Sequence, residues 1–193
     1  PYLKGWYFVD WSNQLKVGEV RPLKLFGREV VLSRTQSGKA LLFDAFCPHL
    51  GAHLGHGGQI KGEGLVCPFH HWEFDENGNC SKVPYSCRVN SKAKLKKWTV
   101  EEANGIIFTY YHPEGGEPSF SLPHWDFFEG KKGWTSQKRK KIVNKALLQD
   151  VVENAVDISH FSPVHFFDNP KLRSLDFLDH TFKMKMDSTK KVL

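Results

Sequence analysis

The chain has 193 residues, a mass of 22.2 kDa and a formal charge of +6 at pH 7, with 40% hydrophobic and 25% charged residues. This composition is close to that of globular proteins, and it excludes disordered, collagen-like and coiled-coil chains. The sequence has no apolar run near the roughly 20 residues that span a bilayer and no signal-peptide pattern at its start, so we expect a cytoplasmic chain or one peripheral to a membrane.

The first half of the chain is patterned as short strands joined by tight turns. β-rich runs at 28–33, 40–46, 94–100 and 105–111 alternate with glycine-containing turns. Asn77-Gly78 and Asn104-Gly105 can supply the positive φ angles of a two-residue hairpin, so at least two hairpins are expected. The sequence therefore predicts a small antiparallel β domain over residues 1–113.

A change of pattern follows. Residues 114–144 mix proline, glycine and aromatic residues without periodicity, which predicts a linker. The basic run at 138–141 lacks the interleaved aromatic residues of a nucleic-acid platform, so we expect a solvated face and no nucleic-acid partner, with an acidic protein as the alternative.

A second domain is expected over residues 145–193. From Lys145, apolar residues recur at three- and four-residue steps, which predicts an amphipathic helix. This helix is expected to carry Asp150, Glu153, Asn154, Asp157 and His160. Apolar residues at alternate positions within 177–186 predict one strand. Because the chain begins at Pro1 and ends within a strand-like stretch, we expect a piece of a longer protein of the α+β class.

Two mixed pairs of cysteine and histidine form the first candidate site. Cys47 and His49 are followed, after a short interval, by Cys67 and His70. Two thiolates can hold one iron of a [2Fe–2S] cluster while two imidazoles hold the other. Tetrahedral zinc is an alternative for the same donors, although zinc sites usually present a cysteine pair and then a histidine pair. The remaining alternative is buried cysteines with incidental histidines.

The segments CPHLGAHLG and CPFHHWEFDENGNC resemble the two cluster loops of Rieske-type oxygenases, including Trp72. The resemblance implies that Cys47, His49, Cys67 and His70 bind a Rieske [2Fe–2S] cluster. It also implies that His71 is not a ligand but faces solvent or packs around the ligands. Cys80 and Cys87 lie outside the loops and are expected to be buried as small apolar residues rather than joined in a disulfide.

A second candidate site lies on the expected helix and just beyond it. Asn154, Asp157 and His160 are three residues apart, and Pro163 is expected to break the helix so that His165 can fold back toward His160. Two imidazoles and one carboxylate would leave three positions open on an octahedral Fe(II).

The segment NAVDISHFSPVH resembles part of the catalytic domain of the same oxygenases. This resemblance implies that His160 and His165 bind a mononuclear Fe(II), and that Asp157 links an iron histidine to a cluster histidine of a neighbouring subunit. It places Asn154 near the iron without strong binding. In the family the third ligand is an aspartate far downstream. We assign none here, since the available carboxylates follow the histidines too closely: Asp168, Asp176, Asp179 and Asp187.

The family resemblance also bears on activity. Leu50 follows His49 where aromatic-ring dioxygenases commonly have arginine, and CPHLGAHLGHGG and KVPYS resemble the sterol-acting branch. This implies an oxygenase that uses O₂ to hydroxylate or desaturate a sterol C–H bond. Electrons would come from NAD(P)H through a ferredoxin and/or flavin reductase, and the assembly would be a homotrimer. The alternatives are a Rieske ferredoxin-like electron carrier, which has no use for NAVDISHFSPVH, and an oxygenase of aromatic or other small substrates.

Overall fold

The structure is a computed structural model that describes residues 2–125, 138, 140, 142–178 and 180–190. The chain divides into two compact units, Pro1–Ser136 and Gln137–Leu193. Much of the expected linker at 114–144, and part of the basic run at 138–141, lie outside the described residues. The finer domain boundary expected at residue 113 stays a prediction.

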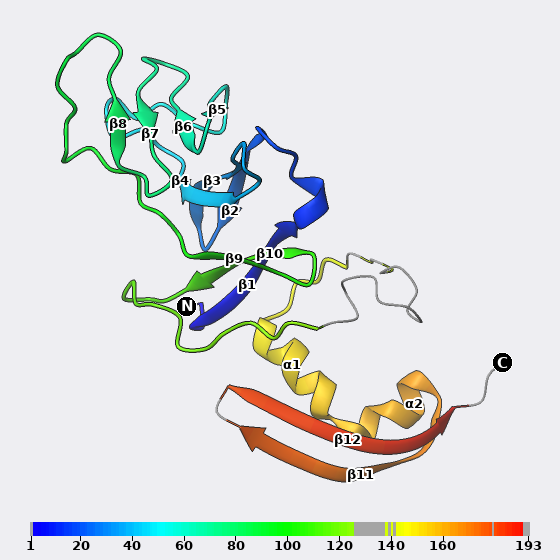
Figure 1. Cartoon of the computed structure of the whole chain (residues 1–193). Coiled ribbons are helices and arrows are strands. Elements are labelled where there is room, and N and C mark those ends of the chain that lie inside the picture. Colours follow the sequence, from blue (N-terminus) through cyan, green and yellow to red (C-terminus); the bar gives the residue numbers. More distant parts are fainter. Residues whose placement is uncertain (1, 126–137, 139, 141, 179, 191–193) are drawn as a thin grey trace. The chain divides into compact units, whose positions relative to one another are not determined.

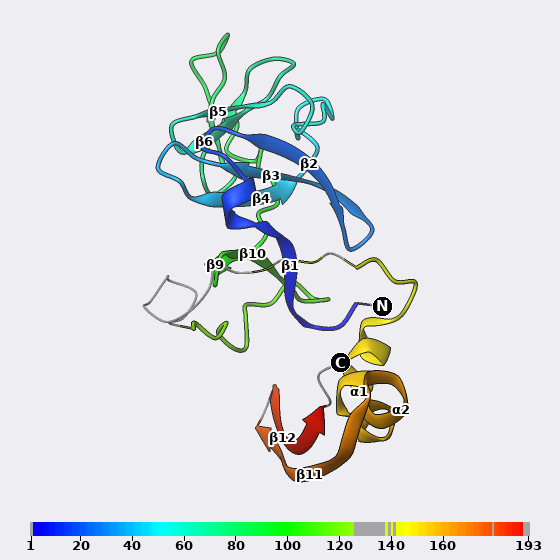
Figure 2. The same cartoon turned by 90° about the vertical axis from the view of Figure 1, so that its right-hand side faces the viewer.

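The described residues of the first unit form three antiparallel sheets (Figure 1). The outer three-stranded sheet has the order β1-β10-β9 and contains β1 (Gly5–Trp11), β10 (Ile106–Tyr111) and β9 (Val100–Ala103). The middle sheet contains β2 (Val20–Leu25), β3 (Arg28–Arg34) and β4 (Ala40–Asp44). The four-stranded sheet contains β5 (Gln59–Lys61), β6 (Gly64–Val66), β7 (Glu73–Phe74) and β8 (Cys80–Lys82). Figures 1 and 2 show β2–β4 between the other two sheets.

Tight turns fix the register of these sheets. Asn77-Gly78 lies between β7 and β8, and Asn104-Gly105 lies between β9 and β10, as expected. The turn between β2 and β3 uses positive φ angles of 52° at Phe26 and 71° at Gly27. A positive φ is unfavourable for phenylalanine. Packing of its ring on Trp98, with centroids 5.6 Å apart, offsets that cost.

The prediction of a strand at 94–100 in the first unit is wrong. Residues 94–99 form only isolated bridges, and β9 begins at Val100. The reason is that the backbone of this stretch bonds to two different parts of the unit. The N–H of Leu95 donates to the carbonyl of Gly78 at 2.8 Å, whereas the N–H of Trp98 donates to the carbonyl of Leu42 at 2.9 Å.

Buried apolar residues of the first unit form two clusters. One contains both predicted cluster cysteines together with Leu54, Trp72 and Phe74. The other includes Leu32, Trp98 and Ile107. The cysteine-bearing loops are therefore anchored in a core.

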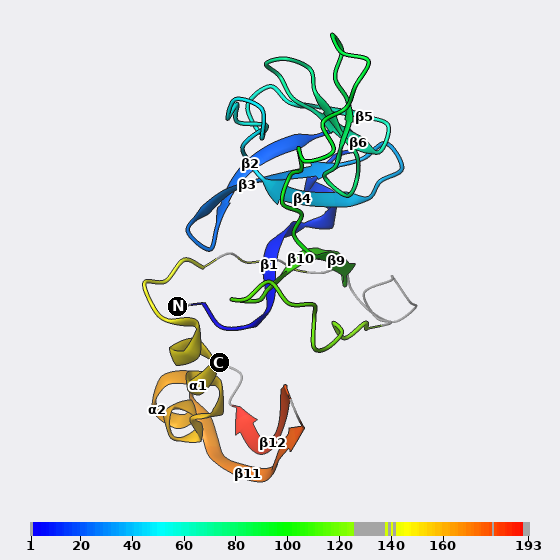
Figure 3. The ribbon, with the colours of Figure 1, turned by 90° about the vertical axis from the view of Figure 1, so that its left-hand side faces the viewer.

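In the part of the second unit that the structure describes, two short helices lie beside a hairpin (Figures 1 and 3). Its elements are α1 (Leu148–Val156), the 3₁₀ turn η3 (Ile158–His160), α2 (Phe161–His165), β11 (Phe167–Leu178) and β12 (Thr181–Lys190). None of the helices in the described part of the chain has the length and apolar character needed to cross a bilayer.

Three local expectations for this unit are wrong. The helix ends at Val156, because the Asp157 side chain accepts the N–H of Ser159 at 3.0 Å and starts a new turn. Pro163 does not interrupt the helical segment in which it lies. It lies in the first turn of α2, where a missing N–H costs nothing. The single strand expected at 177–186 is instead the end of a hairpin, since the chain reverses between β11 and β12.

Candidate functional site

The first unit holds two loops of matching backbone geometry, which we call the first cysteine loop (47–52) and the second cysteine loop (67–72). The N–H of Cys47 donates to the carbonyl of Ala52, and the N–H of Cys67 donates to the carbonyl of Trp72, both at 2.9 Å. In turn, the cysteine carbonyls accept from the residue four positions later, at 2.9 Å and 3.1 Å. Each loop therefore closes on itself through the same two hydrogen bonds.

The two loops bring the four expected cluster donors together. Cys47 and Cys67 are buried, with exposed fractions of 3% and 1%. His49 and His70 are half-buried, and their ring centroids lie 4.8 Å apart at 68°. Two thiols lie inside and two imidazoles lie toward the surface, which matches the division of ligands in a mixed cysteine and histidine cluster.

Burial governs the protonation of the Cys47 thiol. The pKa of Cys47 is raised to about 11, chiefly by burial and also by the neighbouring Cys67 thiol, while the N–H groups of His49 and Leu50 act to lower it. The Cys47 thiol therefore favours the neutral form until a positive charge is supplied. Bound iron supplies that charge and favours the thiolates that ligate it.

The other sequence predictions near the cluster are partly confirmed. His71 is exposed. All four cysteines are free, and Cys80 is buried as expected. The expectation for Cys87 is wrong, because it is exposed. It lies in the stretch 84–92, whose residues are all exposed, so no core element covers it.

One contact around the cluster was not expected from the sequence. The indole of Trp72 stacks on the His49 ring with centroids 4.4 Å apart and an angle of 8°. Its Nε1–H donates to the hydroxyl of Tyr85 at 2.7 Å. Tyr85 belongs to KVPYS, so a signal existed in the sequence, although its structural meaning was not apparent.

The second unit brings His160 and His165 close together. Their ring centroids lie 5.1 Å apart at 69°. The side chain of His160 is 15% exposed, and its Nδ1 lies 3.5 Å from Oδ2 of Asp157, too far for a strong hydrogen bond. Hydrogen bonds from the Ser159 hydroxyl and N–H hold the pKa of Asp157 below its usual value, and His160 adds to this effect. Asn154 is exposed on α1.

The described residues do not include a third ligand for these histidines. No group of three or more His, Cys, Asp or Glu side chains in the described part of the chain could hold a single metal ion, a criterion that does not apply to a [2Fe–2S] cluster with two protein ligands at each iron. Asp168 and Asp176 are exposed on β11, and Asp187 on β12 pairs with Arg173. Asp179 lies outside the described residues. The assignment of His160 and His165 to iron stays a prediction.

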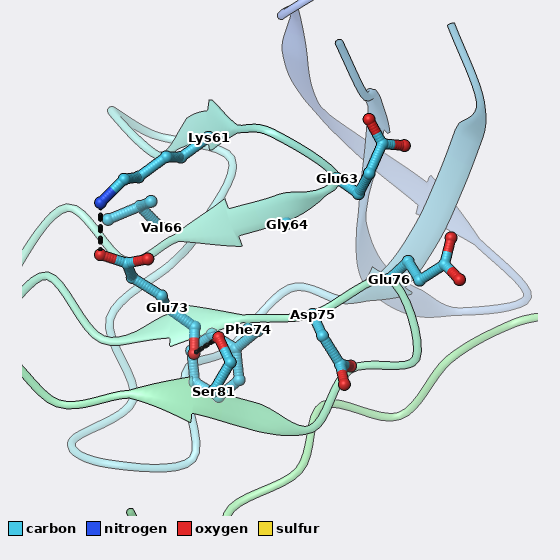
Figure 4. A pocket seen from close by; sticks show the side chains of 9 residues that line it. All are labelled: Lys61, Glu63, Gly64, Val66, Glu73, Phe74, Asp75, Glu76 and Ser81. Atoms are coloured by element: carbon cyan, nitrogen blue, oxygen red, sulfur yellow. Dashed lines mark hydrogen bonds and ion pairs between the residues drawn. The ribbon is translucent and has the colours of Figure 1, made fainter. Parts of the chain in front are cut away.

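A surface depression on the four-stranded sheet contains none of the expected site residues (Figure 4). It is lined by Glu63, Glu73, Asp75 and Glu76, among others, and Lys61 pairs with Glu73 at 2.9 Å. The acidic groups around it are partly neutralised by such pairs, so the two histidine-containing centres remain the candidate sites.

Two family models match almost the whole chain. The Rieske [2Fe-2S] domain matches residues 5–98, and the 3-ketosteroid 9alpha-hydroxylase C-terminal domain matches residues 109–192. Cholesterol 7-desaturase nvd of Xenopus laevis is 36% identical over 95% of this chain and 42% of the relative. The oxygenase component of a 3-ketosteroid-9-alpha-monooxygenase of Rhodococcus rhodochrous is 33% identical over 86% of this chain and 44% of the relative.

A solved structure supports the fold. Dicamba monooxygenase with non-heme iron and dicamba has a TM-score of 0.57 and 22% identity over 65% of this chain and 38% of that chain. The chain thus spans less than half the length of the relatives it matches. The α+β fold class is confirmed, with a small antiparallel β Rieske domain followed by the start of an oxygenase catalytic domain. The chain therefore belongs to the Rieske non-heme iron oxygenases and resembles their sterol-acting branch.

Proposed function

We propose that this chain forms part of a terminal oxygenase that uses O₂ and reductase-supplied electrons to hydroxylate or desaturate a sterol or steroid C–H bond. The observation that carries the proposal is the presence of two histidine-containing centres in one chain. The cysteine loops provide one, and His160 and His165, with rings 5.1 Å apart, provide the other. An electron carrier needs only the first.

The residues of the first centre differ in burial, and we assign the buried and the half-buried ones to different irons. We assign Cys47 and Cys67 to one iron of the [2Fe–2S] cluster, and His49 and His70 to the other. Such a cluster supplies one-electron storage at a potential above that of an all-cysteine cluster. The buried thiols are shielded from water, whereas the half-buried imidazoles lie where electrons can enter and leave.

For the second centre we assign His160 and His165 to mononuclear iron, whose chemistry is the activation of O₂ beside a substrate. The side chain of Asp157 has two separate tasks. Its Oδ1 accepts the Ser159 N–H, and its Oδ2 faces His160. Asn154 lies one turn earlier on α1 and would stand near the metal without binding it.

The names of the relatives support the substrate class. One relative is a cholesterol desaturase and another is a ketosteroid monooxygenase. They share a steroid substrate and differ in the outcome of the reaction. We therefore assign a sterol or steroid to this protein and leave alcohol and alkene as the two products that the experiment distinguishes.

The partners follow from the same comparison. The Rhodococcus relative is named as an oxygenase component, so a separate donor supplies its electrons. We assign the same arrangement here, with a ferredoxin and/or flavin reductase drawing on NAD(P)H. We further propose a head-to-tail homotrimer, in which Asp157 of one subunit accepts from His160 and from a cluster histidine of the next subunit.

Product analysis on the full-length protein tests the function. With a reductase, NAD(P)H and O₂, mass spectrometry on a sterol panel should show addition of one oxygen or loss of two hydrogens. Iron should exceed inorganic sulfide, since the cluster contains equal amounts of both. His160→Ala and His165→Ala should lose the excess iron and the product while retaining sulfide. Equal iron and sulfide, with reversible reduction and no product, would establish an electron carrier instead.

A further inference from the structure

An exposed tyrosine is connected to the cluster loops through a buried indole. Tyr85 has an exposed fraction of 64%, whereas Trp72 has 8%. The Trp72 Nε1–H donates to the Tyr85 hydroxyl at 2.7 Å, and the face of the indole lies parallel to the His49 ring, with centroids 4.4 Å apart. A continuous contact thus runs from the surface to a proposed cluster ligand.

The backbone around Tyr85 is built to hold this position. The N–H of Ser86 donates to the carbonyl of Val83 at 3.1 Å and closes a turn with Pro84 and Tyr85 at its centre. Proline at the second position presets such a turn. Val83 is 5% exposed and belongs to the same apolar cluster as Trp72, so the turn is anchored in the core. This turn lies in the segment KVPYS, which resembles the sterol-acting branch.

Apolar burial does not explain the fixed position of Tyr85. A ring that stays 64% exposed gains little from the hydrophobic effect. The hydrogen bond to a buried indole is the interaction that requires tyrosine, since phenylalanine would leave the Nε1–H of Trp72 without this acceptor. The indole in turn covers one face of His49 and limits rotation of its ring.

We propose that Tyr85 is a positioning residue of the Rieske centre, which acts through Trp72 to fix the plane of the His49 ring and to keep water from one face of it. The inference rests on the proposed role of His49 as a cluster ligand. Partners of ligand histidines set ring orientation, and solvent access tunes the cluster potential.

Spectroscopy and potentiometry of the full-length holoprotein test the inference. Tyr85→Phe keeps the ring and removes only the acceptor. It should leave iron and sulfide content unchanged, broaden the electron paramagnetic resonance lines of the reduced cluster and raise its reduction potential, because water reaching His49 stabilises the added negative charge. Tyr7→Phe is the matched control. Its hydroxyl donates to the carbonyl of Leu3 at 2.7 Å in the same unit, and its loss should change neither signal.

A double substitution tests whether Tyr85 acts through Trp72. In Trp72→Phe, which lacks the N–H, adding Tyr85→Phe should cause no further shift in potential or line width. An unchanged potential and line shape in Tyr85→Phe, or the same shift with and without Trp72, would overturn the inference. Failure of the His49 ligand assignment would look different, because the unmodified protein would then lack the mixed-ligand signature. Failure of the oxygenase function would leave that signature intact and abolish the sterol product.

Discussion

His71 occupies in the second cysteine loop the left-handed backbone position that Gly51 occupies in the first, with φ angles of 55° and 73°. Both residues lie four positions after a cysteine and donate their N–H to its carbonyl. This explains why adjacent histidines differ. The ring of His70 lies beside His49, while the backbone of His71 closes the loop and its side chain is exposed.

Substitutions at His71 should therefore affect folding and not metal content. His71→Val places a β-branched residue at positive φ and should lower the free energy of unfolding by about 1–2 kcal/mol. His71→Gly relieves the strain at the cost of chain entropy and should stay within about 0.5 kcal/mol of the unmodified protein. Denaturant unfolding and sulfide assays check both. Loss of sulfide in His71→Gly would make His71 a ligand and contradict the loop geometry.

The ligand assignment of His70 can be checked by exchanging its donor atom. His70→Cys replaces an imidazole by a thiolate, which adds negative charge at the cluster and should lower the reduction potential toward that of all-cysteine clusters. The mixed-ligand resonance signature should disappear at the same time. His71→Cys adds the same side chain one residue away and should change neither. Equal behaviour of the two variants would refute the assignment.

Local sequence patterns predicted the antiparallel sheets and their Asn-Gly turns because a turn depends on the φ preferences of two adjacent residues. They failed for residues 94–99, where Leu95 and Trp98 are buried in different apolar clusters. Only the packing of the sheets decides that. The end of α1 at Val156 was also missed. The Asp157 side chain accepts the N–H of Ser159, which competes with continuation of the helix, and the spacing of apolar residues does not reveal this bond.

The proximity of the candidate ligands was predictable because each pair is close in sequence and resembles a known motif, while their roles as ligands stay predictions. The contact of Tyr85 was not predictable, since its partner Trp72 is thirteen residues away across β7, β8 and the turn between them. The prediction that Cys87 is buried failed for a related reason. Amino-acid type predicts burial on average, whereas the position of Cys87 in an exposed stretch follows from the fold.

A buried arginine ties together distant segments of the first unit. Arg34 is 8% exposed, and its guanidinium forms two hydrogen bonds with Glu102, at 2.8 and 3.0 Å. It also donates to three backbone carbonyls, those of Ser12, Leu15 and Gly38.

Removal of that charge should be costly. Arg34→Met leaves a carboxylate and several carbonyls without their donor and should lower the free energy of unfolding by about 3 kcal/mol or more. Lys39→Met is the matched control, because Lys39 forms an exposed pair with Glu76 and should cost less than about 1 kcal/mol. Urea unfolding monitored by tryptophan fluorescence measures both. Similar losses in the two variants would contradict the bracing role of Arg34.

The turn between β7 and β8 should make stability depend on acid pH. Burial acts to raise the pKa of Asp75, but hydrogen bonds from Asn79 and Asn77 outweigh it, so its pKa lies below the usual value. A lowered folded-state pKa contributes stability above the unfolded value of about 4, and this contribution is lost as pH falls through the folded pKa. Unfolding at pH about 6 and about 3 should show the stability gap between the unmodified protein and Asp75→Asn narrowing toward acid. A gap independent of pH would refute this origin.

The capping and relay roles of Asp157 can be separated with two substitutions. Oδ1 of Asp157 accepts the N–H of Ser159 at 3.0 Å and also its hydroxyl, while Oδ2 lies 3.5 Å from Nδ1 of His160. Asparagine caps turns as well as aspartate does, so Asp157→Asn should preserve η3 and remove only the negative charge facing His160. Asp157→Ala removes both and should lower the free energy of unfolding by about 1 kcal/mol.

In the full-length protein, Asp157→Asn should therefore retain both kinds of iron and a reducible cluster. Reoxidation of the reduced cluster by O₂ in the presence of substrate should nevertheless slow by orders of magnitude, because the proposed carboxylate link between a cluster histidine and His160 is lost. Stopped-flow absorbance measures that rate, and iron and sulfide assays measure retention. If Asp157→Asn instead loses the non-sulfide iron while cluster reoxidation in the loaded fraction stays fast, Asp157 supports the metal site directly and does not relay electrons.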